Sequence, residues 1–320
     1  MLRRAWQTAM IALARAEGVT RRVQASRVGA ALARRYIAGA TPQAAMARAT
    51  RLKHERSIRG SLFYLGEYVS DLATIEATVA GQASIVSQLA VSPLDAHVSV
   101  DLTQIGQMLD PALARRNAFS VAEAIAGAPH DSSRVKAMML DMEDQSFTDA
   151  TIALHDGLRA AGLPAALTLQ AYLRRTEADL NRQIERGAHV RLVKGAFVAS
   201  AATSFTRRSD IKANSRRLID LMFSRRARES GFYPSIATHD DSLQRYAVER
   251  AEANGWPADR WEIEMLLGVR DELAAALAAA GRRVRLYLPF GVAWWPYAIR
   301  RIGENPFNLV LLTRSLIARG

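Results

Sequence analysis

The chain has 320 residues, of which 49% are hydrophobic and 23% charged, a balance that excludes disordered and fibrous proteins. It contains no cysteine, which excludes a disulfide framework, thiolate-bound metals, iron–sulfur clusters and a cysteine nucleophile, and which fits a reducing, cytoplasmic compartment. Much of the net charge of +12 lies in the first 40 residues, and no run of about 18 apolar residues predicts a transmembrane helix.

Residues 1–59 are predicted to form a basic helical arm. The first 40 hold eight arginines and one acid, Glu17, while apolar residues recur at helical spacing. Four interpretations are open: a mitochondrial-type presequence, a nucleic-acid-binding segment, a contact with anionic lipid on the inner face of a membrane, or helices whose arginines face water. Charged helix faces are usually solvated, which favours the last of these. The two apolar stripes are Trp6, Met10, Leu13 and Ala14, followed by Val28, Ala31, Leu32 and Tyr36.

From about residue 60 onward, short β-type runs alternate with longer helical stretches such as 71–89 and 271–280. Eight strands separated by helices, with no linker rich in proline, glycine or serine, predict one (β/α)8 TIM-like barrel over residues 60–320. We expect it to be distorted, with the last helix over its mouth. An open doubly wound sheet is disfavoured, because no Gly-x-Gly-x-x-Gly loop follows any strand. The expected strands are residues 61–65, 97–102, 136–142, 165–171, 189–193, 234–238, 261–266 and 283–288.

Chemistry in such barrels gathers at the carboxyl ends of the strands, so polar side chains there are the candidates. Asp141 and Glu143 flank one residue, so on a strand both would face the same side and could act as a general acid and base. Two carboxylates alone do not specify a glycosidase. The candidates are Asp101, Asp141, Glu143, Gln170, Arg191, Lys194, Thr238, His239, Glu264 and Tyr287.

Two further patterns concern ligands. The strand that carries Arg191 delivers Lys194 to a turn of Gly195 and Ala196, whose small side chains permit close approach of a ligand to the backbone. No two of the six histidines stand at metal-ligand spacing, so no metal is expected, and His239 is predicted to be a hydrogen-bonding group.

The stretch after the last predicted strand carries the most informative motif. A turn containing Pro289 leads into a helix on which Tyr297, Arg300, Arg301 and Glu304 share one face. Two adjacent guanidiniums there can bind a carboxylate or a phosphate. A solvated charged face is the alternative, and it is disfavoured because this helix directly follows a barrel strand and is rich in aromatic residues.

In chain order, these motifs resemble the FAD-dependent proline dehydrogenase family, in particular its monofunctional bacterial members. The resemblance covers roughly residues 45–312, and its Tyr-x-x-Arg-Arg-x-x-Glu helix is specific in this context. Nine collinear motifs are hard to obtain by chance. They are residues 65–67, 100–104, 140–143, 170–172, 191–196, 237–239, 262–266, 287–289 and 297–304.

The resemblance implies a role for each matching position. Arg300 and Arg301 would bind the substrate carboxylate, and Gln170 and Arg191 would hydrogen-bond the flavin ring near N5. The substrate pocket would be completed by Glu304, Tyr287, Asp141, Leu266, Asp101 and Phe197. The rest of FAD would be held by Val193, Lys194, Gly195, Ala196, Thr238, His239, Asp240 and Glu264.

Five positions depart from the family pattern. Asp101 stands where the family has a lysine that helps to bind the substrate carboxylate. Asp101 therefore weakens the attraction for a carboxylate or pairs with Arg300 or Arg301, and we predict a substrate preference shifted away from plain L-proline. The other departures are Phe197 for tyrosine, Asp240 for asparagine, Glu264 for glutamine and Leu267 for an aromatic residue.

The leading hypothesis is the oxidation of L-proline, or of a close cyclic secondary amino acid, to its pyrroline imine in amino-acid degradation. Hydride would pass to flavin N5 and electrons to a quinone-type acceptor. One alternative is the same chemistry on a hydroxylated or N-substituted proline. The other is a non-catalytic basic barrel that binds nucleic acid through the arm, whereas the leading hypothesis expects no nucleic-acid partner.

Overall fold

A computed structural model describes residues 22, 26–66, 69–129, 134–197 and 199–304, and its centre is a closed barrel of eight parallel strands. Each strand pairs with the next in sequence, and β8 pairs with β1. The predicted (β/α)8 fold is confirmed. The strands are β1 (Arg59–Tyr64), β2 (Ala96–Val100), β3 (Lys136–Leu140), β4 (Ala165–Gln170), β5 (His189–Val193), β6 (Tyr233–Ala237), β7 (Glu262–Leu266) and β8 (Val284–Phe290).

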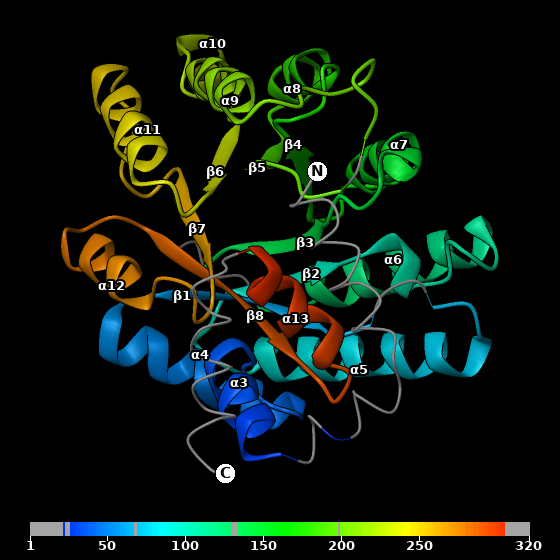
Figure 1. Ribbon diagram of the computed structural model, residues 1–320. Helices are drawn as coiled ribbons and strands as arrows, with labels where there is room; N and C mark the ends of the chain where they lie inside the picture. The colour runs from blue at the N-terminus through cyan, green and yellow to red at the C-terminus, as the bar shows by residue number, and fades with distance from the viewer. Residues whose placement is uncertain (1–21, 23–25, 67–68, 130–133, 198, 305–320) are drawn as a thin grey trace.

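Helices surround the barrel, and α13 lies in front of it near α3 in Figure 1. Among the described helices, none combines the length and the apolar character needed to cross a membrane. The helices are α3 (Arg27–Tyr36), α4 (Pro42–Arg56), α5 (Leu72–Ala90), α6 (Pro111–Ala126), α7 (Thr148–Ala160), α8 (Thr176–Glu185), α9 (Arg208–Met222), α10 (Arg225–Glu229), α11 (Asp241–Ala253), α12 (Asp271–Ala279) and α13 (Trp295–Glu304), with the 3-10 turns η1 (Leu102–Gln104) and η2 (Gln145–Phe147).

Local sequence sets the ends of these elements. In α6 the Asp110 carboxylate accepts hydrogen bonds from the first backbone N–H groups, and Pro111 occupies the first turn, where it has no N–H to satisfy. Strand β5 has the predicted bounds, whereas β3 ends at Leu140 instead of continuing to Met142. The chain then enters η2, where the Asp144 carboxylate accepts a hydrogen bond from the backbone N–H of Ser146.

The described part of the predicted arm packs on the barrel. Helix α4 buries Ala45, Ala49 and Leu52 in the main hydrophobic core. At the end of α3, Tyr36 is buried with Phe63 and Tyr297 in a smaller cluster at the carboxyl end of β1. Of the second predicted stripe, Leu32 packs against this cluster while Ala31 is exposed. The first predicted stripe lies outside the described residues.

Side chains alternate along the strands between the helices and the barrel interior. Those that face the helices are apolar, such as Leu62, Val98 and Ile263, and they form the main core. Those that face inward are largely polar, although Ala137, Met139 and Ala166 form a small apolar group. The barrel is therefore filled mainly by charged and hydroxyl side chains instead of the usual branched apolar layers.

Candidate active site

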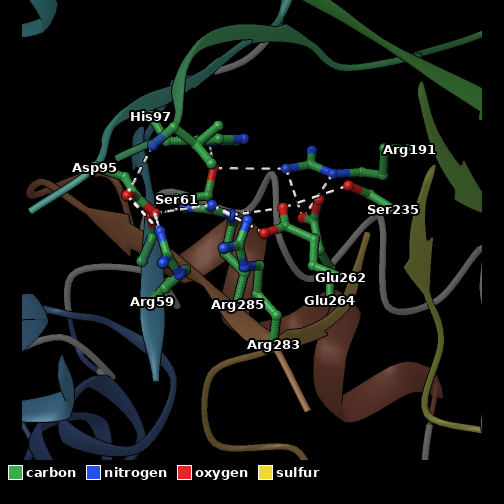
Figure 2. Close-up of polar contacts among 12 residues, drawn as sticks. Arg59, Ser61, Asp95, His97, Arg191, Ser235, Glu262, Glu264, Arg283 and Arg285 are labelled. Carbon is green, nitrogen blue, oxygen red and sulfur yellow. Dashed lines mark hydrogen bonds and ion pairs between the residues drawn. The ribbon is translucent and has the colours of Figure 1, made fainter. Parts of the chain in front are cut away.

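Arg191 on β5 belongs to a buried polar cluster inside the barrel, where Figure 2 shows it near Glu264. Its Nε donates to Glu264 Oε2 on β7 over 2.8 Å, and its Nη1 donates to Asp141 Oδ1 just after β3. Its Nη2 donates to Ser99 Oγ over 3.2 Å. We call Asp141, Arg191 and Glu264 the upper triad. Two strands, β5 and β7, and the segment just after β3 contribute to it, so the fold brings together residues far apart in sequence.

Asp141 connects the upper triad to the mouth of the barrel. The Tyr287 hydroxyl donates to Asp141 Oδ2 over 2.8 Å, and Thr168 Oγ1 donates to Oδ1 over 3.1 Å. Burial raises the pKa of the Asp141 carboxyl, although Arg191 and these hydrogen bonds act in the opposite direction. Burial and the neighbouring Asp141 also hold the pKa of Tyr287 well above its ordinary value. Tyr287 therefore stays a neutral hydrogen-bond donor.

A second ion cluster lies closer to the amino ends of the strands. Arg285 on β8 is fully buried, and its Nε donates to Glu262 Oε1 over 2.8 Å while its Nη2 donates to Asp95 Oδ2 over 2.9 Å (Figure 2). Asp95 also accepts from Arg59. We call Arg59, Asp95, Glu262 and Arg285 the lower cluster. Burial is the largest single influence and opposes the charge of Glu262, but the charge and hydrogen bonds of Arg285, together with His189, lower the pKa of that carboxyl.

The barrel also brings together two histidines that are far apart in the sequence. The ring centres of His97 and His189 lie 5.9 Å apart. One possible metal-ligand atom from each of these histidines and from Glu262 and Glu264 can be chosen so that all four atoms lie within 4.8 Å of one another. Burial lowers the pKa of His189 to about 3 and that of His97 well below its ordinary value, so both rings are neutral. Both carboxylates are bonded to guanidiniums, and these repel a further cation. We therefore interpret this group as part of the ion network.

The carboxyl ends of β4 and β5 hold most of the predicted cofactor residues. Gln170 Nε2 donates to the Met142 and Glu143 carbonyl oxygens, and within the described chain Gln170 Oε1 and the hydroxyl of Tyr172 find no partner although both are buried. The backbone N–H of Tyr172 donates to the carbonyl of Lys194, whose side chain is exposed. The ends of β4 and β5 therefore place two buried polar atoms that lack a partner in the described chain near the cation of Lys194.

Gly195 is held close to the ring of Tyr172. Its φ is +93°, and a Cβ at this position would lie 2.0 Å from Tyr172 Cδ1. The predicted need for a small residue at this turn thus has a specific cause. Ala196 is exposed, while Val193 and Phe197 are half-buried.

The predicted residues after β6 tie neighbouring elements together. His239 Nε2 accepts a hydrogen bond from the backbone N–H of Leu266, which joins the ends of β6 and β7. Asp240 caps α11 and forms an ion pair with Lys212 at 2.8 Å. Although partial burial acts in the opposite direction, hydrogen bonds from Lys212 and from Ser242 lower the pKa of Asp240 to about 2. Thr238 Oγ1 accepts from the Asp240 backbone N–H.

The expected pairing of Asp141 with Glu143 is wrong. Because β3 ends at Leu140, strand alternation does not extend to these residues, and the two carboxylates take different partners. Glu143 accepts from the backbone N–H and the hydroxyl of Thr103. Asp101 is buried at the start of η1, where its carboxylate and the side chain of Gln104 form reciprocal capping hydrogen bonds.

Tyr297, Arg300, Arg301 and Glu304 lie on α13, as the sequence predicts. Tyr297 is buried in the cluster with Tyr36 and Phe63. The side chains of Arg300, Arg301 and Glu304 lie outside the described part of the structure. Their roles remain predictions.

Sequence reasoning missed most of the barrel interior. The sequence does contain a signal for these residues. Polar residues two positions apart on a strand point to the same face, so a strand with polar residues at alternate positions indicates a polar barrel interior. Glu262 and Glu264 follow this pattern, as do Arg283, Arg285 and Tyr287. The residues missed were Arg59, Ser61, Asp95, His97, Ser99, Thr168, His189, Glu262 and Arg285.

Three comparisons with known proteins agree with this architecture. A family model described as proline dehydrogenase matches residues 45–314. Proline dehydrogenase 1 of Bacillus subtilis subsp. natto is 30% identical over 290 residues, which are 90% of this chain and 91% of that protein. A proline dehydrogenase of Deinococcus radiodurans is 29% identical over 292 residues, 89% of this chain and 90% of that protein.

The solved structures similar to this chain include proline utilization A (PutA) from Bdellovibrio bacteriovorus inactivated by N-propargylglycine. The TM-score is 0.76 at 20% identity, over 86% of this chain and 33% of that one. This chain thus spans about a third of the length of that protein. The match supports the barrel fold.

Proposed function

This chain belongs to the proline dehydrogenase family, whose members oxidise proline, and we propose that it carries out the oxidation with FAD and passes the electrons to a quinone-type acceptor. The product is the pyrroline imine. The proposal is supported chiefly by the upper triad and Tyr287, together with buried polar atoms at the carboxyl ends of the strands that have no hydrogen-bond partner among the described residues.

A flavin fits the residues at this end of the barrel. Gln170 Oε1 is a buried acceptor, and the isoalloxazine ring offers N–H groups that can donate to it. The Tyr172 hydroxyl is a second buried polar atom that a cofactor could satisfy. Bound flavin supplies the hydride acceptor, so the chain itself has to orient the two reactants, exclude water and place charge near the ring.

Arg191 would act on the cofactor chiefly through its charge. Its nitrogen atoms donate to Glu264, Asp141, Ser99 and Ser61, which fixes the guanidinium inside the barrel. Its positive charge would favour electron density on the flavin ring, and the carboxylates of Asp141 and Glu264 that pair with it would reduce this effect. The other proposed cofactor contacts are Gln170, Val193, Lys194, Gly195, Ala196, Thr238, His239, Asp240 and Glu264.

For the substrate, we propose that Arg300 and Arg301 bind the carboxylate. Asp141 and Tyr287, which are hydrogen-bonded to each other, would form the floor of the pocket. The remaining walls would come from Leu266, Asp101, Phe197 and Glu304. No side-chain nucleophile is needed, because the hydride leaves the substrate directly for the cofactor.

The visible spectrum of the purified protein tests the cofactor assignment. We expect flavin absorbance, and we expect the nucleotide released by denaturation to be FAD. Release of FMN would correct the assignment to a different flavin. A protein that stays colourless after incubation with FAD would contradict the proposed function.

Asp101→Asn is expected to raise kcat/KM for L-proline by about fivefold or more, since it removes a buried negative charge near the proposed carboxylate site. Asparagine keeps an oxygen that can accept the capping hydrogen bond of η1. Steady-state kinetics with L-proline and its hydroxylated and N-substituted analogues measures the effect. If kcat/KM rises for L-proline but not for cationic or hydrogen-bond-donating analogues, Asp101 alters the substrate preference. If the ratio of kcat/KM for L-proline to that for each analogue is unchanged, the predicted preference is refuted.

We also propose that the arm contacts anionic membrane surfaces, where quinones reside. Each basic residue near such a surface contributes about 1 kcal/mol. Replacing Arg3, Arg4, Arg15 and Arg21 with glutamine is expected to reduce co-sedimentation with anionic liposomes at low salt. A matched set of changes at Arg208, Arg216, Arg225 and Arg226 is the control. Equal recovery of both variants with the liposomes would refute the contact.

A further inference from the structure

The two ion groups inside the barrel differ in their charge balance. In the lower cluster two guanidiniums, of Arg59 and Arg285, face two carboxylates, of Asp95 and Glu262. In the upper triad the single guanidinium of Arg191 faces two carboxylates, of Asp141 and Glu264. The lower cluster is therefore neutral, while the upper triad carries one negative charge more than it can pair.

Among the described residues, no second cation forms an ion pair with Asp141 or Glu264. The nearby histidines are neutral, and the hydroxyls of Ser61, Ser99 and Thr168 are uncharged. Glu264 Oε1 has no hydrogen-bond partner in the described chain, and the Glu264 side chain is only 2% exposed. A buried, unpaired negative charge is costly, and binding a proton removes that cost.

We propose that the upper triad is a proton-binding site, in which Asp141 and Glu264 share one proton across Arg191, and that Glu264 is the positioning residue that creates it. The proton comes from solvent, and its binding changes the charge of the triad from −1 to zero. Since Asp141 accepts from Tyr287 at the mouth of the barrel, the protonation state of this site would set the charge at the proposed cofactor and substrate site.

The direction of the pKa values agrees with this charge count. Burial raises the pKa of both Asp141 and Glu264. In the lower cluster burial again acts to raise the pKa values of Asp95 and Glu262, but the combined charges and hydrogen bonds of Arg285, Arg59 and other neighbours lower them. Other ionisable side chains that face or adjoin the triad are Asp101 and His97 from the β2 segment, His189 from β5, Glu262 from β7, and Arg285 and Tyr287 from β8.

Glu264→Gln and Glu262→Gln form a matched pair for testing the proposal. Both change one carboxylate of β7 to an amide of the same shape, one in the unbalanced triad and one in the balanced cluster. A carboxyl whose pKa is raised by folding contributes stability below its unfolded pKa, and this contribution is lost as pH rises through the folded pKa. A carboxyl whose pKa is lowered contributes stability above its unfolded pKa, lost as pH falls.

The measurement is the Tm of the cofactor-free protein from about pH 4 to about pH 8, the interval above the ordinary carboxyl pKa. Relative to wild type, the Tm of Glu264→Gln should rise with increasing pH, whereas the Tm difference between Glu262→Gln and wild type should stay constant above about pH 6, because the stability that Glu262 contributes is already complete there. Glu264→Asp keeps the charge and should retain the wild-type trend even if its shorter side chain lowers Tm throughout. Parallel trends for the two glutamine variants, or a Tm difference for Glu264→Gln that is independent of pH, would overturn the proposal.

A second readout uses the flavoprotein and rests on the proposed function. The midpoint potential of the bound flavin should be more positive in Glu264→Gln than in wild type at high pH, and this difference should shrink as pH falls and the wild-type triad becomes protonated. A shift of equal size at every pH contradicts a proton-binding triad. Failure of the wild type to bind flavin would remove the proposed function, while the Tm measurement would still decide this inference.

Discussion

Replacing Arg285 with methionine is expected to lower the free energy of unfolding by about 3–5 kcal/mol, because the change strands two buried carboxylates without their shared cation. Arg285 is fully buried and donates to Glu262, Asp95 and the carbonyl of Gly60. Methionine fills a similar volume, so the decrease in the free energy of unfolding chiefly measures the effect of removing the charge. Urea denaturation followed by circular dichroism measures it.

Two further variants make this prediction specific. Adding Glu262→Gln to Arg285→Met removes one of the stranded charges and should recover part of the lost stability. Arg225→Met is the surface control, since Arg225 pairs with Glu229 in solvent and its loss should leave the unfolding midpoint close to that of wild type. An Arg285→Met protein as stable as Arg225→Met would show that the lower cluster does not hold the barrel together.

Gly195→Ala is expected to reduce flavin affinity by about tenfold or more. The residue adopts a φ of +93°, and an alanine Cβ would lie 2.0 Å from the ring of Tyr172. Either the turn that carries Lys194 or the end of β4 has to move, and a cost of about 1–3 kcal/mol in such backbone strain corresponds to at least severalfold in binding. Fluorescence titration of the cofactor-free protein with FAD measures the affinity.

Gly162→Ala is the matched control for this change. Gly162 also has a positive φ, +74°, but no atom lies within 4 Å of the position of an added Cβ. It lies in the loop between α7 and β4, away from the proposed cofactor residues. Both variants carry the backbone strain, and only Gly195→Ala adds the clash with Tyr172. Equal FAD affinity in the two variants would contradict the assignment of this turn to the cofactor.

The barrel could be predicted from sequence because apolar runs and helical periodicity are local signals. Strand β5 has its predicted bounds, and other strands differ by one or two residues where the end depends on a neighbour. The last ladder contact of β3 shows this dependence, since the backbone N–H of Asp141 still donates to the carbonyl of Val100 after the strand has ended.

The site could be predicted only in part. The strand-end rule identified Asp141, Arg191, Glu264 and Tyr287, which the structure joins in one hydrogen-bonded group. It did not reveal that Arg285 and Asp95 form a second ion cluster below them. That contact joins β8 to the residue that precedes β2, and closure of the barrel determines it. No local pattern in the sequence encodes such a contact.

The spacing of the histidines in the sequence did not predict that two of them lie close together, again because closure of the barrel determines this contact. His97 and His189 are 92 positions apart in the sequence, and yet their rings lie 5.9 Å apart in the barrel. Metal-ligand motifs assume that the ligands lie close together on one helix or turn. In a closed barrel, opposite strands bring distant residues together, so polar alternation within strands is the more useful signal.

Anaerobic mixing of the flavin-loaded protein with L-proline tests whether this protein oxidises proline through its flavin. It detects hydride transfer to the cofactor without requiring the identity of the electron acceptor. We expect the visible flavin absorbance to bleach on addition of L-proline or of one close cyclic secondary amino acid, with one equivalent of pyrroline imine formed per flavin. A flavin that stays oxidised with every member of that panel would contradict this expectation.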